Sequence, residues 1–204
     1  MGKSGGFVSI GMAFAKGNGR DQNLRIVCEA LMITGGRITR ISYSNDEAGN
    51  EWVAIEPKDA NPDLSHIRYY GTVTLTTNRF GRINQVVTVS LKDELNFDGL
   101  LIDLDWEDVF TDTNDTESIA SITTSIERLL LDVYQRIPYA YAVAGHEMEL
   151  DWAPDSFPTS ANWLDMFPLS IIPSPEGVAI TYGSISIDGM TRQSKKKLSI
   201  SLDA

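Results

Sequence analysis

Helical periodicity is confined to two long segments of this 204-residue chain, and that limits the folds open to it. In Thr116–Arg136 the apolar residues recur every three or four positions, which predicts an amphipathic helix. Asn114 and Glu117 have the spacing of a capping box, and Pro138 ends the helix. A second helix is predicted over Arg20–Ile33 from the same spacing of Leu24, Val27, Cys28 and Leu31.

The remaining apolar residues mostly alternate with polar ones, which is the two-residue repeat of strands. The predicted strands are 7–15, 37–44, 51–56, 68–77, 83–92, 96–104, 139–150, 169–172, 178–182 and 184–187, with an irregularity between Ile38 and Ile41. Because strands follow one another in consecutive runs, neighbouring strands should pair antiparallel. We therefore predict an α+β fold, a mainly antiparallel sheet with two principal helices packed on one face.

Length and composition favour one domain over residues 1–204, with flexible ends at 1–5 and 193–204. Cys28 is the only cysteine, so neither an intrachain disulfide nor a cysteine cluster for zinc can form. Its place on an apolar helix face is typical of a core residue. Because no stretch approaches the roughly 20 apolar residues that span a bilayer, and free thiols persist in reducing compartments, we expect a cytoplasmic protein.

The net charge of −11 is unevenly distributed. Residues 1–92 hold 11 basic and eight acidic residues, whereas residues 93–191 hold two basic and 19 acidic residues, a charge of −17. Such a field repels nucleic acid and anionic membranes and attracts basic proteins. The same charge could also serve solubility alone.

Two acidic strips, 93–117 and 147–155, concentrate this charge, and each includes a tryptophan. An aromatic ring beside carboxylates is typical of a recognition hot spot for a basic protein. The alternative is that each tryptophan is a partly buried core residue. The residues predicted to bind a partner are Asp98, Asp103, Asp105, Trp106, Glu107, Asp108, Glu147, Glu149, Asp151 and Trp152.

Asp103 and Asp105 would lie on one face of a strand, which suggests a metal-assisted hydrolase with His146 as an alternative. The loop that follows lacks the glycine and the terminal glutamate of an EF-hand. His146 and Glu147 resemble the start of a zinc-protease motif, but the second histidine is missing. We therefore expect no cofactor, no metal and no enzymatic activity. A structural or assembly subunit is a further alternative, and the oligomeric state stays open.

The order of several short segments resembles the immunity protein 64 family of bacterial polymorphic-toxin systems. The resemblance spans roughly residues 6–190 and rests on Gly6–Met12, Gly35–Ile38, Tyr43–Asp46, Glu51–Trp52, Tyr69–Val73, Phe97–Leu104, Tyr139–Tyr141, His146–Glu147 and Ile187–Met190. It implies a small cytoplasmic α+β protein that binds and neutralises a cognate protein toxin. It implies no particular site residues. With the acidic strips, it favours occlusion of a basic toxin by an acidic surface.

Overall fold

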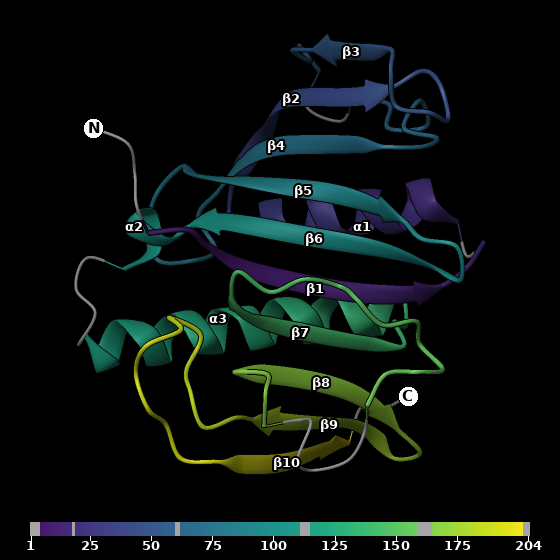
Figure 1. Cartoon of the computed structure of the whole chain (residues 1–204). Coiled ribbons are helices and arrows are strands. Elements are labelled where there is room, and N and C mark those ends of the chain that lie inside the picture. The colour runs from purple at the N-terminus through teal and green to yellow at the C-terminus, as the bar shows by residue number, and fades with distance from the viewer. Residues whose placement is uncertain (1–4, 18, 60–61, 111–114, 159–164, 202–204) are drawn as a thin grey trace.

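A computed structural model describes residues 5–17, 19–59, 62–110, 115–158 and 165–201. Ten strands form one antiparallel sheet in the order β10-β9-β8-β7-β1-β6-β5-β4-β2-β3 (Figure 1). The strands are β1 (Phe7–Ala15), β2 (Gly36–Ser44), β3 (Trp52–Ile55), β4 (Gly71–Thr77), β5 (Gln85–Asp93), β6 (Phe97–Asp105), β7 (Tyr141–His146), β8 (Leu169–Ser174), β9 (Gly177–Tyr182) and β10 (Lys196–Ser201).

Two long helices, α1 (Arg20–Met32) and α3 (Thr116–Arg136), cover the same face of this sheet (Figure 1). Their apolar sides share one core with the inward residues of the strands. The predicted α+β class, with a mainly antiparallel sheet and two principal helices on one face, is confirmed. Among the described residues, no helix is long and apolar enough to cross a membrane.

Local details follow the sequence closely. The bounds of α3 match the prediction, and its N-cap is Asp115, whose carboxylate accepts a hydrogen bond from the Ser118 N–H at 3.0 Å. Asn114, the expected cap, lies outside the described residues. The irregularity in β2 is present between Ile38 and Arg40. Cys28 is buried, and burial raises the pKa of its thiol to about 12, as expected for a core cysteine.

One predicted strand is shorter than expected. The segment 139–150 was predicted as a single strand, but β7 ends at His146. Glu147 has a φ of 49°, and this left-handed conformation cannot continue an extended strand. The chain therefore leaves the sheet at Glu147, and the carboxylates of Glu147, Glu149 and Asp151 do not follow a strand alternation.

The C-terminal region differs from the prediction twice. Residues 184–187 do not form a strand. Instead the Asp188 carboxylate accepts hydrogen bonds from the Ser186 hydroxyl at 2.8 Å and the Thr191 N–H at 3.0 Å, which closes a turn. No strand is predicted beyond residue 187, yet Lys196–Ser201 form the edge strand β10. Leu198 and Ile200 alternate with polar residues and pack against the core. This alternation is short, and the neighbouring lysines made it hard to recognise in the sequence.

The sheet face opposite α1 and α3, here called the second face, is only partly covered. After β7 the chain folds back over its centre, where Leu150 and Phe157 pack with Phe97, Tyr141 and Phe167 in a small second core. Leu150 rests above two glycines, because a methyl group on Gly11 or Gly99 would lie 2.7 or 2.9 Å from its side chain. These glycines form a notch that fixes where the segment crosses the sheet.

Candidate functional site

Strand β1 lies between β6 and β7, and this order brings the two acidic strips together. On one side Phe7 is paired with Asp105 and Ser9 with Asp103. On the other side the Glu147 N–H donates to the Phe7 carbonyl at 2.9 Å. Segments more than 40 residues apart in sequence therefore flank the same strand. We call the resulting surface the acidic ridge, and it consists of Asp103, Asp105, Glu107, Asp108, Glu147, Glu149 and Asp151.

The chain enters β1 through a narrow passage between ridge carboxylates. A methyl group on Gly5 would lie 3.2 Å from Cγ of Glu107, and one on Gly6 would lie 3.0 Å from Cδ of Glu147. Gly6 also has a φ of 70°, which side chains other than glycine rarely adopt. The next side chain, Phe7, is 49% exposed. The exposed phenyl ring thus lies between the acidic residues that follow β6 and those that follow β7.

The ridge residues differ in exposure. Glu107, Glu147, Glu149 and Asp151 are exposed, whereas Asp103, Asp105 and Asp108 are half-buried. At the border of the ridge, Lys92 Nζ lies 3.6 Å from Glu149 Oε2. Because Glu149 is well exposed, solvent screens this pair and it adds little stability. The exposed carboxylates are therefore accessible to a partner.

Asp103 is the ridge residue most influenced by its surroundings. Burial raises the pKa of its carboxyl, and Glu149 adds to this rise. A hydrogen bond from the Ser9 hydroxyl at 2.7 Å and the charge of Lys92 oppose it. Because the pKa of Asp103 is higher in the folded state, its ionised form opposes folding at neutral pH. A nearby positive charge from a partner would remove part of this cost.

The substitution Asp103→Asn is therefore expected to raise the free energy of unfolding at pH 7 by about 0.5–1 kcal/mol. The amide oxygen can still accept from Ser9, while the buried charge is gone. Wild-type Asp103 becomes protonated as the pH falls towards its unfolded pKa of about 3.9, so the advantage should shrink in acid. Urea unfolding at neutral and acidic pH measures both values. An advantage that stays constant with pH would contradict this account, and Asp155→Asn is the exposed control.

Two residues predicted to bind a partner are not on the accessible surface. The Asp98 side chain is buried, at 3% exposure, and it binds Lys16, Arg20 and the Gly17 N–H. Trp106 is also buried; its indole N–H donates to the Asp188 carbonyl at 3.1 Å. In this fold neither side chain is exposed to a partner, because each already has partners within the protein.

Trp152 lies between the two roles considered for the tryptophans, a partner contact and a partly buried core residue. Its ring is half-buried and packs edge-on against Phe157 and Phe167, with centroids 6.3 and 5.5 Å away. The Tyr141 hydroxyl donates to its carbonyl at 2.6 Å. Trp152 therefore contributes to the second core and holds the neighbouring Asp151 in place.

The residues of the alternative hydrolase site do not converge. Asp103 and Asp105 lie on the second face, whereas His146 continues the alternation of Ala142 and Ala144, which face the helices. One ring nitrogen of His146 lies 2.9 Å from the Gly5 carbonyl oxygen. Within the described part of the chain, no group of three or more His, Cys, Asp or Glu residues is arranged to hold a metal ion.

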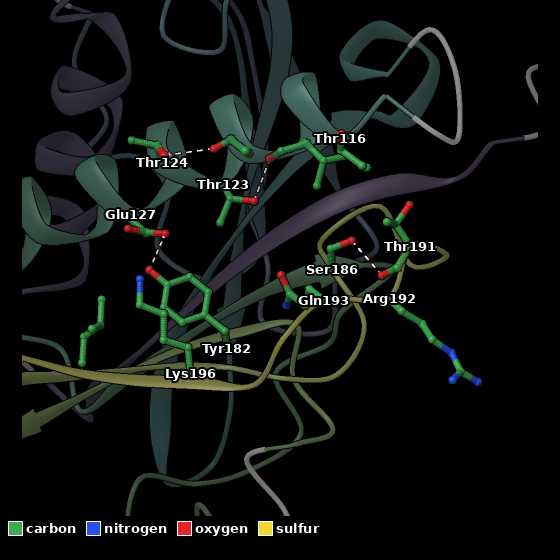
Figure 2. A pocket seen from close by; sticks show the side chains of 13 residues that line it. Thr116, Thr123, Thr124, Glu127, Tyr182, Ser186, Thr191, Arg192, Gln193 and Lys196 are labelled. Carbon is green, nitrogen blue, oxygen red and sulfur yellow. Dashed lines mark hydrogen bonds between the residues drawn. The ribbon is translucent and has the colours of Figure 1, made fainter.

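A cavity of about 490 Å³ lies between α3 and the strands β9 and β10 (Figure 2). Its polar groups bind one another: the Tyr182 hydroxyl donates to Glu127 at 2.8 Å, and Thr123 and Thr124 donate to carbonyls of α3. Gln193 donates to two backbone carbonyls. The cavity therefore offers a ligand mainly the charged groups of Arg192 and Lys196, and Lys196 Nζ already lies 5.4 Å from the centroid of the Tyr182 ring.

Sequence reasoning overlooked Phe7 as a candidate contact residue. The signal was present, because Val8, Ile10, Met12 and Phe14 alternate towards the helix-side core, and that alternation places Phe7 on the opposite face. What local patterns could not show is that β6 and β7 would flank it.

These features define an α+β protein built on one antiparallel sheet, with a charged, partly covered face opposite its helices. The model of the family "Immunity protein 64" matches residues 4–193, and the chain belongs to this family. No curated protein matches the sequence. Among solved structures, "Pseudomonas aeruginosa T6SS protein PA0821" is similar at 10% identity with a TM-score of 0.38; the match covers 69% of this chain and 40% of that one.

Proposed function

We propose that this immunity-family protein binds a cognate bacterial toxin in the cytoplasm and neutralises it by occlusion with the acidic ridge. The observation that supports this proposal best is the convergence of two acidic strips on either side of β1. A single surface with exposed carboxylates on both sides of β1 can contact a partner over a continuous area. Two separate acidic loops could not form such a continuous contact area.

The chemistry of the ridge favours a basic partner. Its charge attracts cationic proteins over a distance and raises the rate of encounter, whereas it repels nucleic acid and anionic lipid. Phe7 supplies apolar area at the centre of the charged surface, as hot spots commonly do. Occlusion needs no chemical step by this protein. It requires only that the ridge cover the surface with which the toxin acts.

The test is binding of the cognate toxin, identified as the product of an adjacent gene from which this protein protects cells, measured at about 50 and about 300 mM salt. The triple variant Glu107→Lys, Glu147→Lys, Asp151→Lys should bind at least about 100-fold more weakly, mainly through slower association. Cells that depend on this variant should lose protection from the toxin. Each position is exposed, and thermal unfolding of the variant checks that it keeps the fold.

A control variant with the same change in net charge separates ridge contacts from overall charge. Asp21, Asp59 and Glu176 are exposed on α1, in the segment after β3 and in the β8–β9 turn, outside both acidic strips. Their replacement by lysine should weaken binding by no more than about threefold, the residual effect of long-range charge. If the ridge variant binds as well as wild type and salt has no effect, occlusion by the acidic ridge is wrong.

A further inference from the structure

Two large aromatic side chains lie exposed at the far end of the second face. Trp52 in β3 is 53% exposed and Tyr70, next to β4, is 42% exposed. The register places Trp52 beside Ser44, whose N–H donates to the Tyr70 carbonyl at 2.9 Å. A small residue therefore separates the two rings. They line one cavity of about 490 Å³, together with residues of β4 and β5 that include Thr72, Ser90 and Lys92.

The turn between β2 and β3 holds both rings in place before any partner arrives. The Trp52 indole N–H donates to the Gly49 carbonyl at 2.8 Å, and Gly49 also lies close to the Tyr70 ring. The Asp46 carboxylate fixes this turn by accepting from the Glu51 N–H at 2.7 Å and the Ser44 hydroxyl at 2.9 Å. Because the rings are already ordered, binding to them costs little conformational entropy.

Of the charged residues that line this cavity, one carboxylate makes no ion pair among the described residues. Lys92 is paired with Glu149, and Asp93 binds both Lys16 and Arg20. Glu94, which also lines the cavity, is exposed, and its carboxylate makes no ion pair among the described residues, while its carbonyl oxygen accepts from Lys16 Nζ at 2.6 Å. Two aromatic faces and an exposed carboxylate are the combination that attracts a long cationic side chain.

We propose that this aromatic pocket accepts a lysine or arginine side chain of the same toxin, an inference that rests on the proposed function. The stem of that side chain lies against Trp52 and Tyr70, and its charge faces Glu94. The pocket and the ridge lie on one sheet face, and Lys92 lines the pocket while pairing with Glu149 of the ridge. Across the sheet, β6 and β3 are four strand spacings apart, about 19 Å. Along the strands, the register sets Gly71 and Leu91 level with Leu100, five residues or about 17 Å before Asp105, so the diagonal is about 25 Å. One interface of about 800 Å² per partner can span both.

The acidic ridge and the aromatic pocket then affect different rate constants of toxin binding, the ridge the association rate and the pocket the dissociation rate. Exposed ridge carboxylates steer the basic toxin and accelerate association, an effect that salt weakens. The aromatic pocket buries apolar area after contact, so it slows dissociation and is insensitive to salt. A partner held by the ridge alone would bind quickly and leave quickly.

The experiment immobilises this protein and measures the association and dissociation rates of the cognate toxin by surface plasmon resonance. Trp52→Ala should raise the dissociation rate at least about tenfold and change the association rate by less than about threefold, with the salt dependence unaltered. Tyr70→Ala and Glu94→Gln should each raise the dissociation rate by about three- to tenfold. Trp52→Phe should restore most of the loss, because a ring remains.

Ile83→Ala is the matched control, since Ile83 is 84% exposed in the β4–β5 loop, outside the pocket. It should leave both rates within about twofold of wild type. If wild type forms the complex and the ridge variant weakens it, while the Trp52, Tyr70 and Glu94 variants dissociate at the wild-type rate, the pocket assignment is wrong and the ridge proposal stands. If wild type forms no complex with the toxin, both proposals are overturned.

Discussion

Asp98→Ala is expected to lower the free energy of unfolding by about 2–4 kcal/mol. The carboxylate is buried at the start of β6 and joins three parts of the fold. It accepts from Lys16 Nζ at 3.0 Å, from Arg20 Nη2 at 2.9 Å and from the Gly17 N–H at 3.1 Å. Removing it leaves two cations sharing only Asp93 and an unsatisfied backbone donor at the entrance to α1.

The effect should depend on pH in a defined direction. Burial alone would raise the pKa of Asp98, but the Gly17 N–H, Lys16 and Arg20 outweigh it and lower the pKa. A lowered pKa stabilises the folded state above the unfolded value of about 3.9, and this contribution is lost as the pH falls through the folded value. Urea unfolding of wild type and Asp98→Ala should therefore give curves that converge in strong acid.

Asp98→Asn separates charge from shape, because it keeps an acceptor for the Gly17 N–H. It should cost less than the alanine variant at pH 7 and show the same convergence in acid. If both variants unfold like wild type at pH 7, the cluster around Asp98 does not stabilise the fold, and the reason for excluding Asp98 from the partner surface is weakened.

Local sequence patterns predicted most of the secondary structure of this protein. The alternation in β4 and β5 and the helical repeat of α3 each report which side chains face one core, so they specify the element directly. The failures have local physical causes. Glu147 adopts a left-handed conformation within a segment that otherwise reads as a strand, and three lysines obscured the short alternation of β10.

The candidate site was less accessible to sequence reasoning, because it depends on strand order. The acidic composition of residues 93–117 and 147–155 is visible in the sequence. That the two strips meet depends on β1, which is far from both in sequence but pairs with β6 and β7. Composition also cannot tell a surface carboxylate from a buried one. Asp98 and Asp103 lie in the same strand, yet they point to opposite sides of the sheet.

Leu150→Asp is expected to release residues 147–158 from the second face and to weaken binding of the toxin together with local stability. Leu150 is 6% exposed above Gly11 and Gly99, and a carboxylate there would have no partner in the apolar second core. The cost of burying it is several kcal/mol, about 3 or more, so the segment should detach instead. Hydrogen exchange should show lost protection in 147–158, while β1 and β6 stay protected.

A double-mutant cycle tests whether the glycine notch positions this part of the ridge. Leu150→Ala should cost about 2–3 kcal/mol by leaving a cavity. Gly11→Ala should cost about 1–3 kcal/mol, because its methyl group would lie 2.7 Å from the Leu150 side chain. In the double variant, the methyl group added at position 11 occupies part of the space left by Leu150→Ala. The loss in the free energy of unfolding should therefore be about 1 kcal/mol smaller than the sum of the two single losses. Strictly additive costs would mean that Leu150 and Gly11 are not in contact. The positions of Glu147, Glu149 and Asp151 would then have to depend on other contacts, such as the Tyr141–Trp152 hydrogen bond and the hydrogen bond from the Glu147 N–H to the Phe7 carbonyl.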